Sequence, residues 1–276
     1  MTYAATADGL DGRVAVVTGG GSGIGEAICL RLARDGATVV VLDVDPAGAQ
    51  ATAGLCGGRA VTADVADGAR VEEVAQQVAR ELGRIDVWVN NAGVASTDAY
   101  RQAVDQRAEQ RLREGAAGDQ LTDLDALLGV DDAEWRRMIA IHLDGTFFGM
   151  RAATRVMTPR RAGSIVNISS ICGIAGCESH PHYSAAKAGI IGLTRASAKE
   201  LVTVGIRVNA IAPGYVDTPP VRSMPEDVTR ALLASVPAHR LGAPAEIAAT
   251  VAFLVSDDAS YVVGQVISPN GGVLTA

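Results

Sequence analysis

Short runs of apolar, mostly β-branched residues alternate with stretches of helical periodicity, and this alternation most constrains the fold of the chain. The runs are Val14–Thr18, Thr38–Asp43, Arg59–Ala63, Ile85–Asn90, Ser164–Ser169, Ile206–Ala212 and Gln265–Ser268. Helical periodicity covers Gly25–Asp35 and Val71–Leu82. Strands that are apolar along their whole length must be covered on both faces. The pattern therefore predicts an α/β fold of three layers, a doubly wound parallel sheet between two layers of helices.

The length of the chain, 276 residues with 48% hydrophobic, is enough for one large core. Open α/β sheets of this size usually form one domain, so we expect residues 1–276 to fold together.

A polar insert, residues 97–130, interrupts the pattern after the fourth predicted strand. Glu109 and Arg113 stand four residues apart there, as in an exposed helix. The insert is either a solvated surface hairpin or a lid or subunit contact near the ligand-binding edge of the sheet.

The charge balance excludes two classes of partner. A net charge of −7 and an isoelectric point near 5.1 disfavour binding to nucleic acid or to an anionic membrane. No apolar run approaches the ~18–20 residues of a membrane span, and the first ten residues lack the features of a signal peptide. Four cysteines at irregular spacing, Cys29, Cys56, Cys172 and Cys177, do not indicate a disulfide framework. We therefore expect a cytoplasmic protein in a reducing compartment.

A glycine-rich stretch, TGGGSGIG, follows the first predicted strand and opens the first helix. Glycine lets the backbone turn tightly and approach a pyrophosphate, and the helix N-terminus presents free N–H groups. A glycine turn can also serve only the close packing of helix on strand. The stretch differs from GxGxxG, and it is not a P-loop because no Gly-Lys-Ser/Thr ends it. Its place between strand and helix predicts a nucleotide site that includes Gly19, Ser22, Gly23, Ile24 and Gly25.

Asp43 ends the second predicted strand, 18 positions (43 − 25) after Gly25. A carboxylate there can accept hydrogen bonds from both hydroxyls of the NAD ribose and repels the 2′-phosphate of NADP. The glycine-rich stretch holds no arginine to offset that charge. The alternative is an acidic strand end that faces solvent. We predict NAD as the cofactor.

Tyr183 and Lys187 stand four residues apart at the start of a helical stretch. This spacing puts both side chains on one helix face, where the ammonium can lower the pKa of the phenol. Such a pair occurs by chance in roughly one chain in thirty of this composition. However, the chain has 22 Arg and only two Lys, Lys187 and Lys199. A lysine at position 187 fits a role that needs a compact, tunable ammonium.

Six segments in this order resemble the short-chain dehydrogenase/reductase family in its single-domain Rossmann form. They are the glycine-rich stretch, Ala63-Asp64-Val65, Asn90-Asn-Ala-Gly93, Ser169-Ser170, Tyr183-x-x-x-Lys187 and Pro213-Gly-Tyr-Val-Asp-Thr218. The resemblance runs from Arg13 to Gly272, apart from the insert. It implies an oxidoreductase that moves hydride between a nicotinamide cofactor and a small alcohol or ketone. It also implies a homo-oligomer, a tetramer or a dimer, through helices expected at Asp132–Met157 and Tyr183–Val202.

The resemblance implies a role for each matched residue. Tyr183 would be the general acid and base, Lys187 would lower its pKa and hold the nicotinamide ribose, and Ser170 would hydrogen-bond the reacting oxygen. Ser169 would be structural. The other cofactor contacts would come from Asp64 and Val65 at the adenine, from Asn91, Ala92 and Gly93 under the cofactor, and from Pro213, Val216 and Thr218 near the carboxamide.

Two features need separate interpretation. His142 stands where the family usually has an Asn that binds a proton-relaying water. An imidazole can also hold water and exchange protons near pH ~6.5, so His142 is a candidate catalytic residue, or else it only fills space. Cys172, Cys177, His180 and His182 are zinc-ligand types. The family places this segment in a wall of the substrate pocket, so we expect no metal there.

The predicted function is an NAD-dependent oxidoreductase for a secondary alcohol or ketone of mainly apolar character. The expected substrate loop, residues 214–241, carries apolar side chains at Tyr215, Val221, Met224, Leu232, Leu233 and Val236. One alternative is a 3-oxoacyl thioester reductase, because Ala188–Arg195 resembles those proteins, although that branch more often uses NADP. Another is an NAD(H)-binding regulatory protein without turnover, which only His142 favours.

Overall fold

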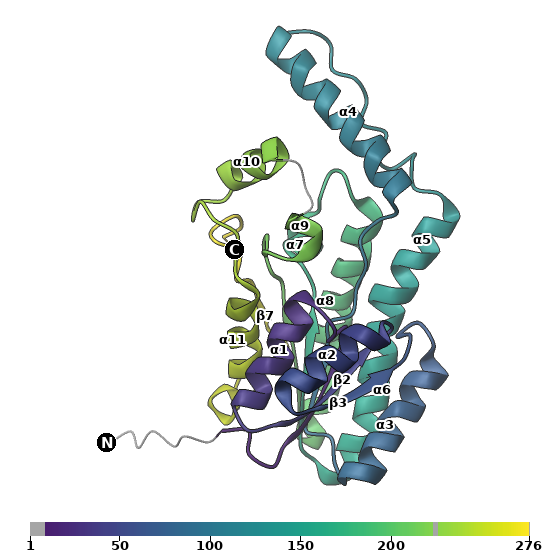
Figure 1. Ribbon diagram of the computed structural model, residues 1–276, viewed down its shortest axis with the longest axis vertical. Coiled ribbons are helices and arrows are strands. Elements are labelled where there is room, and N and C mark those ends of the chain that lie inside the picture. Colours follow the sequence, from purple (N-terminus) through teal and green to yellow (C-terminus); the bar gives the residue numbers. More distant parts are fainter. Residues whose placement is uncertain (1–8, 223–225, 276) are drawn as a thin grey trace, which may run out of the picture.

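The computed structural model describes residues 9–222 and 226–275, and its strands form one parallel sheet of seven (Figure 1). They are β1 Val14–Thr18, β2 Thr38–Asp43, β3 Arg59–Thr62, β4 Val87–Asn90, β5 Gly163–Ile168, β6 Ile206–Ile211 and β7 Val266–Ile267. Their order across the sheet is β3-β2-β1-β4-β5-β6-β7. The chain therefore winds outward in both directions from β1 and β4. Ligands of open α/β sheets bind at the carboxyl ends of the strands at this switch point.

Helices cover both faces of the sheet, which confirms the three predicted layers. One face carries α1 Gly23–Arg34, α2 Pro46–Cys56 and α11 Pro244–Val255. The other carries α3 Gly68–Leu82, α6 Gly145–Met157 and α8 Pro181–Leu201. In β1, Ala15 and Val17 belong to the core under the first layer, whereas Val14 and Val16 belong to the core under the second. This alternation explains why the strand is apolar at every position.

Local sequence signals set the ends of the helices. Asp45 and Asp67 accept hydrogen bonds from N–H groups in the first turns of α2 and α3. Gly57 and Gly83 end the same two helices in the left-handed conformation. Both devices satisfy backbone groups that a helix end leaves unpaired. All seven predicted strands are present, and each of their ends lies within two residues of the expected position.

The remaining elements surround the carboxyl end of the sheet or join the layers. The helix expected over Asp132–Met157 is interrupted, because a π-helical turn, Ala140–Asp144, separates α5 Asp132–Ile139 from α6. The short helices α7 Ile171–Ala175, α9 Pro219–Arg222 and α10 Glu226–Ser235 lie in the upper half of Figure 1, below the tip of the insert. Single 3₁₀ turns occupy Thr158–Arg160, Val202–Val204 and Asp257–Ala259.

The insert forms a long helix that projects from the body of the molecule (Figure 1). This helix, α4, covers Asp98–Ala117, and the predicted Glu109–Arg113 pair is an exposed ion pair on it. The chain returns without further regular structure. A small separate core joins the two halves of the insert, formed by Tyr100, Val104, Leu124, Ala126 and Val130. The insert is therefore a hairpin that is packed at its base, with its distal part in solvent.

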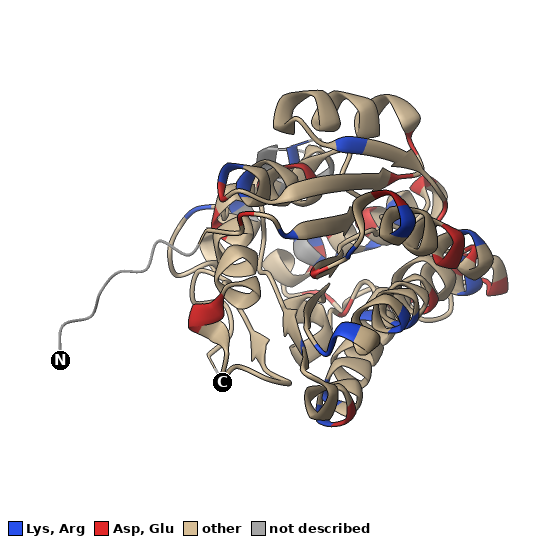
Figure 2. Cartoon of the chain, turned by 90° about the horizontal axis from the view of Figure 1, so that it is seen from below, with Lys and Arg blue, Asp and Glu red and all other residues tan. Residues whose placement is uncertain are grey.

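Charged residues of both signs are interspersed over the helices in the view of Figure 2. In the described part of the chain, no helix is long and apolar enough to cross a membrane. Two sequence-based expectations fall on residues outside the described ranges. They concern the start of the chain, residues 1–8, and Met224 of the expected substrate loop.

Candidate active site

The glycine-rich stretch turns between β1 and α1, at the switch point of the sheet. Gly19 and Gly23 have positive φ angles of +63° and +56°, a conformation that favours glycine. A Cβ atom on Gly19 would lie 2.7 Å from the Cα atom of Ala92, and one on Gly25 would overlap the carbonyl oxygen of Gly19. Only glycine at these positions lets the turn, α1 and the segment after β4 pack this closely.

The first turn of α1 presents unpaired backbone donors. Ser22 is its N-cap and makes no side-chain capping bond. The first helical hydrogen bond runs from the N–H of Glu26 to the carbonyl of Ser22. The N–H groups of Gly23, Ile24 and Gly25 therefore remain for a ligand, at the positive end of the helix dipole. This donor set fits the pyrophosphate of a dinucleotide.

The segment after β4 is fastened to the glycine-rich stretch. The side-chain amide of Asn91 donates to the carbonyl oxygens of Thr18 and Gly19, at 3.1 and 3.0 Å. The backbone N–H groups of Asn91 and Ala92 donate to Thr18 Oγ1, at 3.0 and 3.1 Å. Asn91 and Ala92, predicted to lie under the cofactor, thus share one rigid unit with the turn that starts α1.

Asp43 lies at the end of β2 and contacts the same turn. Its Oδ2 accepts a hydrogen bond from the N–H of Gly21 at 2.8 Å, and its Oδ1 accepts one from the N–H of Asp45 at 3.0 Å. The side chain is half-buried, whereas Val44 and Asp45 are exposed. Asp43 is therefore not simply an acidic strand end in solvent, because its carboxylate also shapes the predicted nucleotide site.

Asp64 and Val65 follow β3 on the same edge of the sheet. Asp64 is exposed, and its Oδ1 accepts a hydrogen bond from the N–H of Ala66 at 2.9 Å. Val65 is buried against the start of α6, where a Cβ atom on Gly145 would lie 2.9 Å from Val65 Cγ2. The two predicted adenine contacts thus differ in environment, one polar and open and the other apolar and packed.

The loop after β6 closes the predicted cofactor site from the other side. The carbonyl of Pro213 accepts a hydrogen bond from the N–H of Ile171 at 3.0 Å. Val216 is buried and forms an isolated bridge with Gly242. Thr218 Oγ1 donates to the carbonyl of Val216 at 3.3 Å. A Cβ atom on Gly23 would lie 3.6 Å from Thr218 Cγ2, so this loop faces the first turn of α1.

Ser170, Tyr183 and Lys187 meet where β5 ends and α8 begins, as predicted from the sequence. Ser170 lies close enough to Tyr183 for its hydroxyl to lower the pKa of the phenol. Lys187 Nζ donates to the carbonyl of Ile168 at 2.8 Å and lies 5.6 Å from the centroid of the Tyr183 ring. Ser169 instead donates to the carbonyl of Lys187 at 2.8 Å, a structural contact.

Burial dominates the electrostatics of this cluster. It raises the pKa of Tyr183, and the hydrogen bond from Ser170 acts in the opposite direction. Burial also lowers the pKa of Lys187 from 10.5 to about 7. Lys187 can therefore exchange a proton near neutral pH, directly beside a phenol that a serine hydroxyl orients. Such an arrangement can give a proton to a carbonyl oxygen or take one from an alcohol.

The surroundings of His142 oppose protonation near pH ~6.5. It is 2% exposed in the π-helical turn, and its Nε2 lies 3.1 Å from the N–H nitrogen and 3.0 Å from the carbonyl oxygen of Val94. Burial, followed by the charge of Lys187, lowers the pKa of His142 to about 3. At this pKa the imidazole is neutral at physiological pH, which argues against proton exchange by His142 near pH ~6.5.

The His142 ring nevertheless lies within the cluster. Its centroid is 5.3 Å from that of the Tyr183 ring, which it meets edge to face. A Cβ atom on Gly93 would lie 2.5 Å from His142 Cε1, so the ring packs directly against Gly93. Its Nδ1 is buried without a hydrogen-bond partner among the protein atoms that the structure describes. His142 thus contacts both Gly93, on the predicted cofactor floor, and Tyr183.

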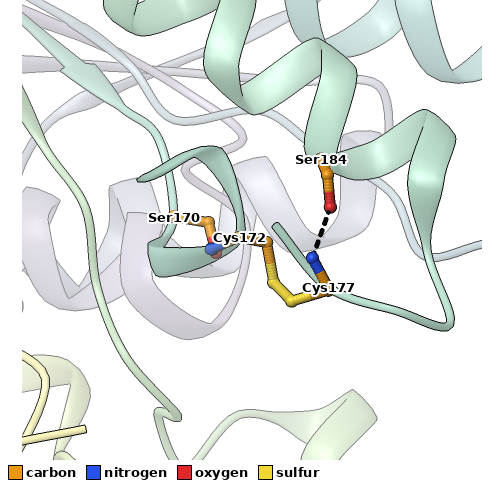
Figure 3. The surroundings of a disulfide bond; sticks show 4 residues. All are labelled: Ser170, Cys172, Cys177 and Ser184. Atoms are coloured by element: carbon orange, nitrogen blue, oxygen red, sulfur yellow. Dashed lines mark hydrogen bonds between the residues drawn. A yellow bond between two sulfur atoms is a disulfide. The ribbon is translucent and has the colours of Figure 1, made fainter. Parts of the chain in front are cut away.

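Cys172 and Cys177 form a disulfide, a pairing that was not predicted from the sequence (Figure 3). Their Cα atoms are 5.0 Å apart, and only five positions separate them in the sequence. The bridge is a local link between α7 and the loop before α8, and not the disulfide framework of a small secreted domain. The spacing of the cysteines therefore did not predict it. Cys29 and Cys56 are free. Within residues 9–222 and 226–275, no group of three or more potential ligands is arranged to hold a metal ion.

A buried polar cluster behind Tyr183 was missed by sequence reasoning. His182 Nε2 lies 3.0 Å from Ser96 Oγ and 3.3 Å from Glu134 Oε1. Glu134 Oε1 also accepts a hydrogen bond from the N–H of Thr97 at 3.1 Å. The ring of Tyr100, on α4, packs edge-on against His182 with centroids 4.9 Å apart. The base of the insert is therefore anchored to α8, the helix that carries Tyr183.

Comparison with known proteins agrees with this geometry. The family model described as short chain dehydrogenase matches residues 13–229. The 3-oxoacyl-(acyl-carrier-protein) reductases of Thermotoga maritima and Escherichia coli are both 36% identical to the chain, over 96% and 95% of it and 99% and 98% of their own length. Cis-4-hydroxycyclohexanecarboxylate dehydrogenase of Sinomonas cyclohexanicum is 42% identical over 94% of this chain and 96% of its own. The chain belongs to the short-chain dehydrogenase family, whose members bind a nicotinamide cofactor, and it is an oxidoreductase acting on CH–OH or carbonyl groups.

Proposed function

We propose that this chain is an NAD-dependent dehydrogenase or reductase whose substrate is a secondary alcohol or ketone of mainly apolar character. The observation that carries the proposal is the meeting of Ser170, Tyr183 and Lys187 beside a dinucleotide-type turn. The relative named for a hydroxycyclohexanecarboxylate supports a cyclic secondary alcohol. A panel of secondary alcohols and ketones, assayed with NAD and NADP side by side, tests it. Turnover should be fastest with NAD and an apolar substrate, and failure of every alcohol and ketone would refute the proposal.

The residues of the site have separate roles in the proposed reaction. The nicotinamide, when bound, supplies or accepts the hydride. Tyr183 gives a proton to the reacting oxygen during reduction and takes it during oxidation, while Ser170 hydrogen-bonds that oxygen. The ammonium of Lys187 favours the ionised form of Tyr183. Asp43 holds the adenosine ribose through its carboxylate.

A second candidate, a 3-oxoacyl thioester reductase, is favoured by two relatives that carry this activity in their names. Its substrate is a long flexible thioester, and reduction would be the working direction. An acyl thioester assayed with NADPH separates the two candidates. Efficient turnover of that pair, with little oxidation of simple secondary alcohols by NAD, would favour the reductase. The converged catalytic cluster gives no support to a regulatory protein without turnover.

Asp43 is expected to select NAD. Asp43→Asn should lower kcat/KM with NAD by about 10–100-fold, since a hydrogen bond to a charged group contributes ~1.5–3 kcal/mol. Adding Val44→Arg, at the exposed position beside it, should raise kcat/KM with NADP by pairing with the 2′-phosphate. Asp45→Asn is the matched control, because it also removes one negative charge nearby. A wild-type enzyme that already prefers NADP would contradict the assignment.

We further propose that the insert covers the substrate entrance and that the chain is a homo-oligomer, a tetramer or dimer. Exposed apolar side chains on α5 and α6, Trp135 and Phe147, support subunit contacts there. Replacing residues 108–121 by a short Gly-Ser linker leaves the base of the insert intact, including the Arg107–Asp125 ion pair.

This trimmed variant should have a higher KM or a broader substrate range, with unchanged NADH affinity and an unchanged mass by light scattering. A fall to the monomer mass would instead make the insert a subunit contact. An unaltered substrate profile would show that residues 108–121 have no part in substrate access. Wild-type protein that is monomeric at micromolar concentration would refute the oligomer.

His142 is proposed to aid proton transfer as a neutral hydrogen-bonding group through its Nδ1, which has no hydrogen-bond partner within the described residues. His142→Leu should lower kcat by about 10²-fold with little change in KM, the size of a lost proton-transfer aid. His142→Asn should keep most activity, because an amide can also hold a water. The wild-type kcat profile should lack a step near pH ~6.5, since the pKa of His142 is about 3. Wild-type kcat in the Leu variant from pH 6 to 9 would show that the ring only fills space.

We also propose that residues 1–276 act as one domain, that residues 214–241 form the substrate loop, and that the protein is cytoplasmic. The single sheet from Val14 to Ile267 supports one domain. In the loop, Val236 is buried, and Leu232 and Leu233 are half-buried, which suits an apolar substrate. The free Cys29 and Cys56 suit a reducing compartment, whereas the Cys172–Cys177 disulfide suits a more oxidising one.

A further inference from the structure

The Cys172–Cys177 disulfide lies between the two hydroxyl-bearing residues of the catalytic cluster. Ser170 is the N-cap of α7, and its Oγ accepts a hydrogen bond from the N–H of Cys172 at 3.1 Å. The N–H of Cys177 donates to Ser184 Oγ at 2.9 Å, one residue after Tyr183 (Figure 3). The bridge therefore links a turn that begins at Ser170 to a loop that is held at the start of α8.

The α7 helix also rests on the backbone of the third catalytic residue. A Cβ atom on Gly173 would lie 2.6 Å from the carbonyl carbon of Lys187 and 2.8 Å from Ser169 Oγ. Yet α7 is only five residues long, and a helix this short is not stable by itself. Its position depends on tertiary restraints, of which the disulfide is the only covalent one.

We propose that the Cys172–Cys177 disulfide is a specificity-determining restraint on the wall of the substrate pocket, and that its reduction loosens α7 and relaxes substrate selection. The inference rests on the proposed function, because it assigns this wall to the substrate of the same site. The exposed Ile174 on α7 gives the wall an apolar side chain. Cofactor binding should depend little on the bridge, since the predicted contacts to the pyrophosphate, the adenosine ribose and the adenine lie on the turn after β1, at Asp43 and after β3, outside residues 171–184.

The chemistry of the switch is thiol–disulfide exchange with a dithiol. One thiolate of the dithiol attacks a cystine sulfur, forms a mixed disulfide and releases the other cysteine as a thiolate, which takes up a proton. The second thiol of the reductant then displaces the remaining cysteine, so two electrons pass from the dithiol to the cystine. An oxidised dithiol reverses the reaction. Both cysteines are partly exposed, so a reductant can reach them, whereas Cys29 is buried.

The bridge closes a short loop, and short loops constrain the unfolded chain less than long ones do. Its loss should therefore change substrate recognition more than thermal stability. The test begins with a thiol count under denaturing conditions. Enzyme prepared without reductant should show two of its four cysteines as free thiols, and enzyme treated with dithiothreitol should show all four.

Kinetics are then compared between oxidised wild type, reduced wild type and the double variant Cys172→Ser/Cys177→Ser. In the last two, KM for the preferred alcohol should rise about 5–10-fold and discrimination against bulkier alcohols should fall, with NAD affinity within about twofold. Reoxidation should restore the wild type only. Cys56→Ser, which removes a free thiol, is the matched control and should respond to dithiothreitol as the wild type does.

Backbone amide exchange provides a readout that does not need turnover. Reduction should speed exchange in residues 171–184 and leave residues 23–34 of α1 unchanged. Four free thiols in oxidant-treated protein, equal KM and selectivity in all redox forms, or unchanged exchange would each overturn the proposal. If no alcohol or ketone is turned over in any form, the proposed function fails, and the exchange result still decides whether the bridge restrains the wall.

Discussion

Tyr183→Phe should lower kcat by about 10³-fold while leaving NADH affinity within about twofold. The phenol is the only titratable hydroxyl in the catalytic cluster, and a lost general acid or base typically costs 10²–10⁴-fold. The ring itself keeps its place between His142 and Lys187 in the variant, because Phe has the same shape. The loss should therefore fall on kcat and not on folding or cofactor binding.

The pH dependence gives this prediction a second readout. Oxidation needs Tyr183 deprotonated, so kcat/KM for an alcohol should rise with pH, whereas reduction needs the phenol and should fall. Burial raises the pKa of Tyr183, and the hydroxyl of Ser170 opposes that shift, so burial and Ser170 together set the pH at which each limb appears. The Phe variant should lack both limbs. Tyr261→Phe is the control, because Tyr261 is 99% exposed, and it should behave as wild type. A Tyr183→Phe enzyme within tenfold of wild-type kcat would show that another group carries the proton.

The features that were predictable from sequence are those encoded by neighbouring residues. The strands were found because most of their residues are apolar, and an inner strand such as β1, which is buried at every position, has no polar side to encode. Tyr183 and Lys187 were found because four residues make one turn of a helix. Gly19 and Gly25 were found because a turn that packs against a second segment tolerates no Cβ atom. Each of these signals lies within a few residues of sequence.

The features that were missed arise where distant segments meet. His182, Ser96 and Glu134 come from α8, the segment after β4 and α5, and no local pattern places them together. The core of the insert joins Tyr100 to Ala126 across a polar helix and its return. His142 was placed correctly in sequence, but its pKa depends on burial and on Lys187, which spacing does not reveal. The physical cause in each case is tertiary packing, which also decides which polar groups lose water.

Burial of Lys187 is expected to lower the stability of the folded protein. Its side chain is 4% exposed, and the one hydrogen bond of Nζ within the described residues is to the carbonyl of Ile168. The unfolded chain binds its proton up to pH ~10.5, whereas the folded chain releases it at about 7. Between these two pH values the unfolded state holds one proton more than the folded state, so the free energy of unfolding rises with pH. Below about pH 7 both states are protonated, and burial of the charged lysine then lowers the free energy of unfolding by its full amount.

Lys187→Met should therefore abolish most activity, lowering kcat by about 10²–10³-fold, while stabilising the fold at pH 7 by roughly 2 kcal/mol. The shift in pKa corresponds to roughly 4–5 kcal/mol at ~1.4 kcal/mol per unit, and the unpaired carbonyl of Ile168 offsets ~1–3 kcal/mol of that gain. Denaturant unfolding of the cofactor-free protein should show this advantage at pH 7 and a smaller one at pH 10. Lys187→Arg should instead be both inactive and less stable, because a guanidinium cannot shed its charge on burial. A Met variant that is less stable than wild type at pH 7, by an amount independent of pH, would mean that the folded protein keeps this ammonium charged and compensated.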